Sequence, residues 1–356
     1  MKLHLRASVA ALFTTVLLAG PATAQQTIRL TMAASHPATI PWINLMSTYF
    51  KPEVDKRLAA SGKFKIEWNE AYGGQLYKFN ATLSAVQDGI TDIGWVGTVF
   101  ESSKMQLANV TYNAPFATDN ALVLAEIFNE LNDTMPALKK EWDDHNAVFL
   151  AATVVDTHNL FTKTPTVKFE DLKGKKISSP GVAAVFLRGT GAVAVDGALT
   201  SWYTDIQSGV TDGVVTIPSG FFPAKLYEVA PHISRLSIGA MFTGGLAINK
   251  DSWAKLPPEV KTALREVGRE YSKQLGALVN KRSEEAISAM LERGAKLAPW
   301  PAEERAKWVS SMPNVARDWA RAAEGRGKPG TAVLAAYMDA LRNRGETPAR
   351  NWDKDQ

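Results

Sequence analysis

The sequence predicts an α/β fold with two similar lobes, and three observations lead to this prediction. First, residues 86–93 read VQDGITDI and residues 206–213 read IQSGVTDG, so nearly the same eight-residue unit occurs in each half of the chain. Second, strand and helix patterns alternate along both halves, which favours a doubly wound parallel sheet. Third, a helical pattern runs from residue 259 to about residue 293, which is unusually long for a globular domain and suits a helix that spans both lobes.

Each copy of the repeated unit closes a helical pattern with a glycine, Gly89 or Gly209, and then enters an apolar run typical of a strand. Glycine adopts the left-handed conformation after a helix at little cost. The repetition therefore indicates the same topology in both lobes, with the ligand site in the cleft between them. An alternative stays open, because many unrelated helices also end in glycine before a strand.

The first half of the chain alternates between strand and helix patterns. Its helical segments carry apolar residues three or four positions apart, and its strands alternate in polarity or are uniformly apolar. Gly73 and Gly74 break the chain before the second helix. The predicted strands are 27–33, 64–68 and 147–155, and the predicted helices are 41–58, 80–87 and 120–144.

The second half repeats this character and ends in helices. A glycine-rich, extended stretch over 239–249 is expected to cross between the lobes, where hinge residues absorb changes in φ and ψ. Pro258 begins the long helix, because proline suits the first helical turn. The predicted strands are 176–179, 192–195 and 214–217, and the predicted helices are 182–189, 200–208, 259–293, 302–325 and 331–344.

The N-terminal residues have the features of a secretory signal peptide. Lys2 and Arg6 form a basic region, and residues 9–18 form an apolar stretch too short to span a bilayer comfortably. Ala22-Thr23-Ala24 is a cleavage site of the A-x-A type, so we expect cleavage after Ala24 and export to the periplasm. No later stretch is apolar enough for a membrane span.

Composition and motifs exclude several classes of function. The chain has no cysteine, which rules out disulfides and thiol nucleophiles, and its net charge of +4 is spread without a long basic run, so we see no nucleic-acid footprint. The five histidines are widely spaced, and none pairs at zinc-ligand spacing. The sequence has no G-x-S-x-G, H-E-x-x-H or Walker motif. We therefore expect no enzyme, no cofactor and no metal site.

Aromatic and polar residues at predicted strand ends and loops form the candidate binding set, because α/β proteins bind ligands there. Each of these residues has core packing or loop exposure as the alternative interpretation. Aromatic rings with hydroxyl, amide and imidazole groups favour a small, partly apolar organic molecule. The predicted ligand-binding residues are His36, Tyr72, Gln75 and Trp95 in the first lobe, and His158, Asn159, Phe161, Ser178, Ser179, Trp202, Tyr203, Ser219 and Phe221 in the second.

Several segments together resemble the periplasmic solute receptors of TRAP transporters, of the dicarboxylate-receptor (DctP) type. They are D-L-K-G-K-K-I (171–177), G-A-V (191–193), Tyr203 with G-V-T-D-G (209–213), L-Y-E-V (226–229), I-N-K (248–250), Trp253 and L-P-P-E-V (256–260). The match is collinear from about residue 27 to residue 280. The resemblance implies a type II periplasmic-binding-protein-like fold, closure of two lobes around one solute, and docking of the loaded receptor on membrane permease subunits.

The sequence departs from this family at the position that matters most for the solute. Members similar to this chain usually carry an arginine that grips the solute's carboxylate, and that position is Ser178 here. A second arginine of some members corresponds to Asn159, and the glutamate of metal-assisted members is missing over 214–216. The resemblance therefore implies a neutral or zwitterionic solute, or an acid held by other donors such as His158, and it adds Thr216 as a solute contact.

We expect a non-enzymatic receptor with two α/β lobes joined by a hinge and a long spanning helix. The expected division is a signal peptide over 1–24, a first lobe over 25–155 plus about 245–281, and a second lobe over 156–244 plus about 282–356 with the C-terminal helices. Two other functions stay open: a solute-sensing adaptor for a signalling protein, and a periplasmic hydrolase or isomerase, for which the sequence offers no nucleophile–base pair.

Overall fold

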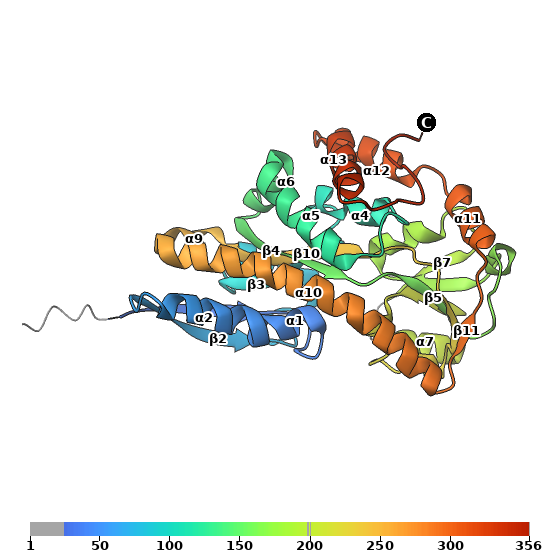
Figure 1. Ribbon diagram of the computed structural model, residues 1–356, viewed down its shortest axis with the longest axis horizontal. Helices are drawn as coiled ribbons and strands as arrows, with labels where there is room; N and C mark the ends of the chain where they lie inside the picture. The colour runs from blue at the N-terminus through green and yellow to red at the C-terminus, as the bar shows by residue number, and fades with distance from the viewer. Residues whose placement is uncertain (1–24, 198, 200, 356) are drawn as a thin grey trace, which may run out of the picture.

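The computed structural model describes residues 25–197, 199 and 201–355, and within them the chain forms two β-sheets surrounded by helices (Figure 1). The predicted signal peptide, residues 1–24, lies outside the described residues. None of the helices in the described part of the chain has the length and hydropathy of a membrane span.

The first sheet has five strands in the order β2-β1-β3-β10-β4. β1 pairs in parallel with β2 and β3, whereas β10 is antiparallel to both β3 and β4. β10 approaches β3 closely at Gly244, where a Cβ atom would lie 1.9 Å from the carbonyl oxygen of Val96. The strands are β1 (Gln26–Ala33), β2 (Phe64–Ala71), β3 (Ile93–Gly97), β4 (Ala147–Val155) and β10 (Met241–Asn249).

The helices around the first sheet cover the segments predicted over 41–58 and 80–87, together with several short helices that the sequence patterns do not predict. The single helix predicted over 120–144 is wrong, because Met135 is extended (φ −98°, ψ 108°) ahead of Pro136 and divides it in two. The helices are α1 (Pro41–Leu45), the π-helix η1 (Met46–Phe50), α2 (Lys51–Ala59), η2 (Phe79–Ala81), α3 (Thr82–Gln87), η3 (Thr98–Phe100), η4 (Leu107–Asn109), α4 (Val110–Asn113), α5 (Ala121–Thr134), α6 (Pro136–Asp143) and α9 (Lys250–Lys255).

The second sheet has six strands in the order β11-β9-β5-β8-β6-β7. β6 is parallel to β7 and β8, and β5 is antiparallel to β8 and β9. The strands are β5 (Asn159–Thr162), β6 (Lys176–Ser179), β7 (Val193–Asp196), β8 (Gly213–Thr216), β9 (His232–Ser234) and β11 (Lys296–Ala298), and the helices are η5 (Phe169–Leu172), η6 (Gly181–Leu187), α7 (Trp202–Ser208), α8 (Pro218–Phe221) and η7 (Leu226–Glu228).

Two predictions about these sheets are wrong. Neither sheet is purely parallel, because β10 and β5 run against their neighbours. The stretch over 239–249 is not mainly a crossover, because most of it forms β10 in the middle of the first sheet. Its glycines allow close strand packing, as at Gly244.

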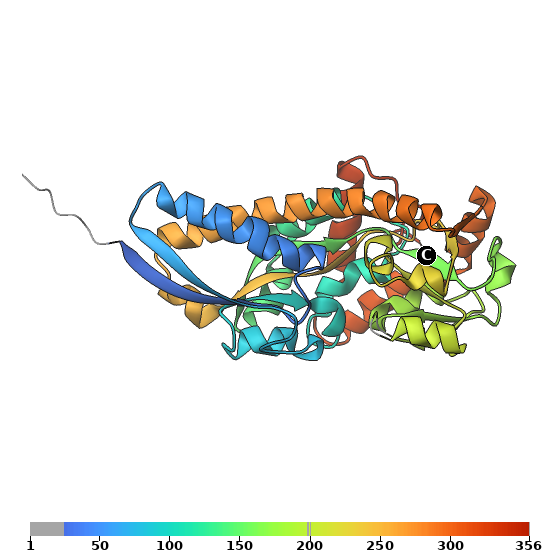
Figure 2. The same cartoon turned by 90° about the horizontal axis from the view of Figure 1, so that it is seen from below.

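The long helix α10 (Pro258–Glu292) runs along one side of the molecule and packs on elements of both sheets (Figure 2). It contacts α2 and β4 of the first lobe and α8 of the second. The remaining helices are α11 (Ala302–Ser311), α12 (Val315–Glu324) and α13 (Gly330–Asn343). The single helix predicted over 302–325 is wrong, because Met312 is extended (φ −70°, ψ 131°) ahead of Pro313. α12 and α13 pack on α4 and α5, beside the first sheet. The residue boundaries of the two lobes stay a prediction.

Two further connections join the sheets, besides α10. The first is the segment from Asp156 to His158, which links β4 to β5, and the second links β9 to β10. Hydrogen bonds hold these two crossovers together, since the N–H of His158 donates to the carbonyl of Gly239 and the N–H of Ile238 donates to the carbonyl of His158. The chain thus forms two α/β lobes joined by paired crossovers and a spanning helix.

Candidate functional site

Four aromatic rings lie together at the edge of the first sheet where β1 and β3 end. The ring of His36, which follows β1, lies 4.9 Å from that of Trp95 in β3, between ring centroids. The ring of Trp42 in α1 lies 5.9 Å from Trp95, and that of Phe100 in η3 lies 6.4 Å from it. The His36 ring also stacks on Phe100 at 6.2 Å. This aromatic group provides flat apolar surfaces at the carboxyl ends of the strands.

Three buried polar side chains lie at the corresponding edge of the second sheet without a hydrogen-bond partner. They are the hydroxyls of Ser178 and Ser179, at the end of β6, and the indole N–H of Trp202, at the start of α7. A Cβ atom at Gly197 would lie 2.4 Å from Ser178 Oγ and 2.8 Å from Trp202 Nε1. Ser178 and Trp202 therefore converge on one point, which only glycine leaves open to them.

The two edges meet where η3 contacts η6, directly after the two serines. A Cβ atom at Gly181 would lie 3.8 Å from the carbonyl oxygen of Val99 in η3. On the first-sheet side, the Trp42 indole N–H and the Thr98 hydroxyl are also buried without a partner. A buried polar group without a partner costs about 1–3 kcal/mol. Such groups on both sides of one junction indicate a place where a ligand or water supplies the missing bonds.

The ionisable groups near this junction are a neutral histidine, a carboxylate and a carboxylate–lysine ion pair. Burial lowers the pKa of His36 to about 4, so its imidazole is uncharged at neutral pH. Asp196 lies opposite Ser179 in the register of β6 and β7. Glu101, which follows η3, is 5% exposed, and its Oε1 has no partner while its Oε2 lies 3.3 Å from Lys104 Nζ. In the part of the chain that the structure describes, no lysine or arginine hydrogen-bonds to the side chain of Ser178, Ser179 or Trp202.

Two predicted site residues hold the crossovers. Asn159 Oδ1 accepts hydrogen bonds from the backbone N–H groups of Leu236 and Ser237, at 2.9 and 3.1 Å. His158 Nδ1 lies 3.2 Å from the carbonyl oxygen of Gly239, and burial lowers its pKa to about 4. A neutral His158 offers no positive charge to an acidic solute.

The contacts of the remaining predicted residues do not connect them to the junction. Phe161 and Phe221 stack on each other at 3.8 Å inside the second core cluster, and the half-buried Tyr203 donates to Glu228 Oε2 at 2.9 Å. The others are placed as follows: Tyr72 donates to Glu70, Gln75 is exposed, Thr216 is buried opposite Asn159, and Ser219 donates to Asp156. The residue assignments of the site stay a prediction.

Sequence reasoning did not single out Trp42, Thr98, Phe100 or Gly197. The spacing of Trp42 in an amphipathic helix is typical of core, and Phe100 and Thr98 follow β3 without a motif of their own. Gly197 follows the end of β7, and glycine after a strand end is a signal of close approach that could have found it.

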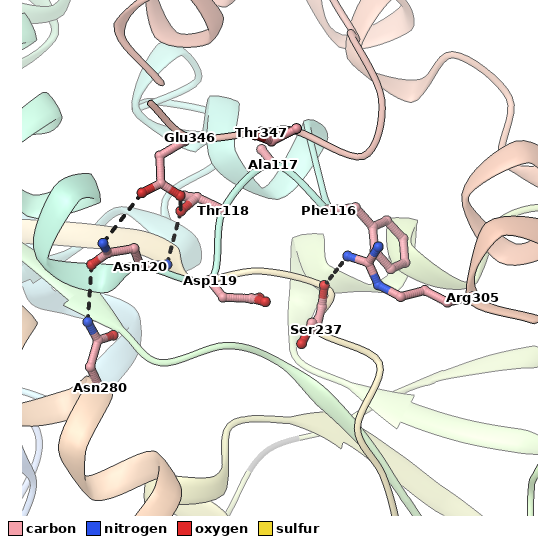
Figure 3. A pocket seen from close by; sticks show the side chains of 10 residues that line it. All are labelled: Phe116, Ala117, Thr118, Asp119, Asn120, Ser237, Asn280, Arg305, Glu346 and Thr347. Carbon is pink, nitrogen blue, oxygen red and sulfur yellow. Dashed lines mark hydrogen bonds between the residues drawn. The ribbon is translucent and has the colours of Figure 1, made fainter. Parts of the chain in front are cut away.

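A separate cavity of about 500 Å³ lies beside the crossovers and away from this junction (Figure 3). The guanidinium of Arg305 donates to the carbonyls of Leu236 and Ser237 and lies 5.1 Å from the Phe116 ring, while Glu346 accepts from Thr118. These polar groups are engaged with the protein itself. The cavity therefore has weaker chemical grounds for a ligand than the junction.

Comparison with known proteins gives one family over most of the chain. The sequence model of the family described as bacterial extracellular solute-binding protein, family 7 (DctP), matches residues 32–322. The C4-dicarboxylate-binding periplasmic protein DctP of Rhodobacter capsulatus is 31% identical over 148 residues, which are 41% of this chain and 44% of that protein. A solute-binding protein of a Sulfitobacter species is 30% identical over 125 residues, 33% of this chain and 37% of its own length. The chain thus aligns with less than half the length of these curated relatives.

Solved structures of TRAP solute-binding proteins share the fold. One from Rhodoferax ferrireducens, in complex with copurified benzoate, has a TM-score of 0.77 at 23% identity and covers 89% of this chain and 98% of its own. DctP7 of Bordetella pertussis, an extracytoplasmic solute receptor binding pyroglutamic acid, has a TM-score of 0.73 at 19% identity, with coverage of 87% and 99%. The predicted resemblance and the predicted fold class are confirmed.

Proposed function

Because this chain belongs to the bacterial extracellular solute-binding proteins of family 7, we propose that it captures one small organic solute between its two lobes and delivers it to the membrane subunits of a TRAP permease. The proposal includes export by the signal peptide and cleavage after Ala24. The chain then acts as a receptor that binds without chemical conversion.

The observation that carries this proposal is the set of unpartnered polar groups at the junction of the lobes. Ser178, Ser179 and Trp202 are fully or almost fully buried, with 0%, 0% and 3% exposed, yet their polar side-chain atoms have no partner. Leaving them so costs about 1–3 kcal/mol each, which a bound solute would recover. The aromatic group of His36, Trp42, Trp95 and Phe100 supports the other half of the site, because flat apolar rings suit the carbon skeleton of an organic solute.

The solute of this receptor is neutral or zwitterionic in our proposal. An indole N–H donates only, and a serine hydroxyl donates or accepts, so the pair of Ser178 and Trp202 suits a carbonyl or hydroxyl oxygen. A carboxylate would need a cation, because burying an unpaired charge is costly. The nearby carboxylate of Asp196 would repel an acid, and His36 is uncharged.

Closure around the solute is the step that a permease would recognise. A solute that contacts both lobes binds the closed arrangement more tightly than the open one, and it shifts the population by that difference in affinity. The contact between η3 and η6 is the rim where the lobes would come together over the solute. A solute-sensing adaptor would use the same closure with a signalling partner, and co-purification with permease subunits separates the two functions.

A thermal-shift screen with isothermal titration tests the capture of a solute. A ligand at about one hundred times its dissociation constant stabilises the folded protein by about 2.7 kcal/mol, so a true solute gives a clear shift in Tm. The panel contains matched carboxylates, their amides or esters, sugars, and zwitterionic amino-acid derivatives. Tight binding of a neutral or zwitterionic compound supports the proposal. Tight binding of a simple carboxylate retains the receptor but refutes the proposed class of solute.

A further inference from the structure

Asp156 lies on the first crossover between the lobes, directly after β4 ends at Val155. Its side chain is among the most buried charged groups of the molecule, with 1% of the residue exposed. Three elements meet around it: the crossover itself, α8 of the second lobe, and α10, which packs on α8. The carboxyl therefore lies where the crossover, the second lobe and the spanning helix meet.

The Asp156 carboxyl binds the start of α8 with both oxygens. Oδ1 accepts from the hydroxyl of Ser219 at 2.5 Å, and Oδ2 accepts from the backbone N–H of the same residue at 3.1 Å. Ser283 of α10 also lowers the pKa of the Asp156 carboxyl. The Ser283 hydroxyl is buried and makes no hydrogen bond. This clamp joins the crossover to the second lobe and places it against the spanning helix.

Among the residues that the structure describes, no charged side chain forms an ion pair with Asp156. On its own crossover the titratable neighbour is His158, and Asp119 reaches that crossover through a 2.6 Å hydrogen bond from Thr157. α8 carries no titratable residue, and on α10 the charged residues next to Ser283 are Arg282 and Glu284. The pKa of Asp156 is set by burial first, and then by the hydrogen bonds from Ser219 and the backbone and by the nearby Ser283 hydroxyl, with no charged partner among the causes.

Burial raises the pKa of Asp156 from its ordinary 3.8 to about 6. A group whose pKa is raised in one arrangement binds its proton more tightly there, so protonation stabilises that arrangement. The stabilisation is complete below about pH 3.8 and is lost as the pH rises through about 6. An arrangement that admits water to the crossover returns the pKa of Asp156 toward its ordinary value. Such an arrangement is favoured when the carboxyl is charged.

We propose that Asp156 is a proton-linked latch at the hinge: acid holds the lobes in the arrangement in which Asp156 is buried against Ser219 and Ser283, and ionisation favours an arrangement in which the crossover is hydrated. This latch rests on the lobe motion of the proposed function. It couples the pH outside the cell to solute affinity through the hinge, at a distance from the solute-contacting residues.

Spin labels in both lobes test the latch directly, because the chain has no native cysteine to block. Cysteines replace Lys65 in β2 and Ser208 in α7, which are both exposed. Electron–electron distance measurements are made between about pH 4.5 and 7.5 on the full mature chain. For wild type we expect the populations of two distances to exchange with a midpoint at or below about pH 6, and their ratio to change by up to roughly thirtyfold over this range.

The Asp156→Asn variant should remove this exchange, because it cannot ionise. The matched control is Asp119→Asn, a carboxyl beside the same crossover that is exposed, and it should keep the wild-type midpoint. Buried His36 and His158 respond to acid in the opposite sense and are present in every variant, so the difference between variants isolates Asp156. If Asp156→Asn does not fold, Ser219→Ala removes one hydrogen bond to the carboxylate and should move the midpoint to higher pH.

Two outcomes overturn the latch and are distinct from failure of the proposed function. Equal pH dependence in wild type and Asp156→Asn, or a distance that changes with solute but not with pH, refutes the latch and leaves solute capture intact. A distance that changes with neither solute nor pH refutes the latch together with lobe closure.

Discussion

Asp92 and Asp212 make the same hydrogen bond in the two lobes. The carboxylate of Asp92 accepts from the backbone N–H of Thr31 in β1, and that of Asp212 accepts from the backbone N–H of Lys176 in β6, both at 2.8 Å. Each aspartate precedes a strand that runs parallel to the strand it holds. The repeated unit therefore carries a strand-pairing device in addition to its glycine, and the two lobes share it.

Removing this hydrogen bond should weaken the second lobe. Asp212→Ala leaves the Lys176 N–H without its partner and should lower the free energy of unfolding by about 1–2 kcal/mol, a modest value because Asp212 is partly exposed. Asp212→Asn keeps an accepting oxygen and should lose less. Urea denaturation of both variants measures the difference, and equal stability of Asp212→Ala and wild type would contradict the prediction.

The neighbouring residues Trp202 and Tyr203 should differ in their effect on solute binding. Trp202 is buried with a free indole N–H, whereas Tyr203 points to Glu228 at the surface. Trp202→Phe should weaken the solute about tenfold or more, since a buried hydrogen bond to the ligand is lost, and Tyr203→Phe should change affinity less than about threefold. Isothermal titration with the identified solute measures both affinities. A larger loss of affinity in Tyr203→Phe than in Trp202→Phe would contradict the prediction and place the site at Tyr203.

A methyl group at Gly197 should close the point on which the two donors converge. The added Cβ would lie 2.4 Å from Ser178 Oγ and 2.8 Å from Trp202 Nε1, so one of them must move. Gly197→Ala should therefore reduce affinity at least about tenfold while retaining the circular dichroism spectrum of the wild type. Gly325→Ala is the control, because its Cβ meets nothing nearer than 3.5 Å. Full affinity in Gly197→Ala would remove this point from the site.

Acid should destabilise the protein through His158. Its pKa is about 4 in the folded state because of burial, against 6.5 ordinarily, so the unfolded chain takes up the proton first. The free energy of unfolding should fall as the pH drops from about 6.5 to 4, by at most about 3 kcal/mol from this residue. In His158→Gln the difference in stability between these two pH values should shrink. An unchanged difference would show that His158 is not the buried base responsible.

The repeated unit and the long helix were predictable because both depend on local chemistry. Gly89 and Gly209 have φ values of +70° and +83°, so both glycines of the repeated unit adopt the left-handed conformation that the motif predicts. The helix predicted over 259–293 is observed as Pro258–Glu292, since proline at a helix start and sustained helical periodicity are local signals.

Strand direction and short elements were not predictable from the same patterns. The sequence of an apolar strand such as Met241–Asn249 does not show whether it is parallel or antiparallel to its neighbours. Its direction depends on residues far away in the sequence. β9 and β11 have three residues each, too few for a periodic signal.

The candidate site was partly predictable, and the reason lies in individual partners. Trp95, Ser178 and Trp202 were predicted from their positions at strand and helix ends, and they lie at the candidate site, where their role stays a prediction. Phe161 and Phe221 are also aromatic, but their rings stack on each other in a hydrophobic core. Which aromatic or polar group is already satisfied depends on tertiary contacts, and the sequence does not contain that information in a local form.

Native mass spectrometry of the mature protein and its Gly197→Ala variant, both purified from the periplasm without refolding, is the direct test of a solute site at Ser178 and Trp202. We expect that wild type carries one neutral or zwitterionic organic molecule and that the variant, prepared in parallel and equally folded, has lost it. Two results would contradict a solute site at Ser178 and Trp202. One is that both proteins retain the same molecule to the same extent, and the other is that both carry a bound carboxylate.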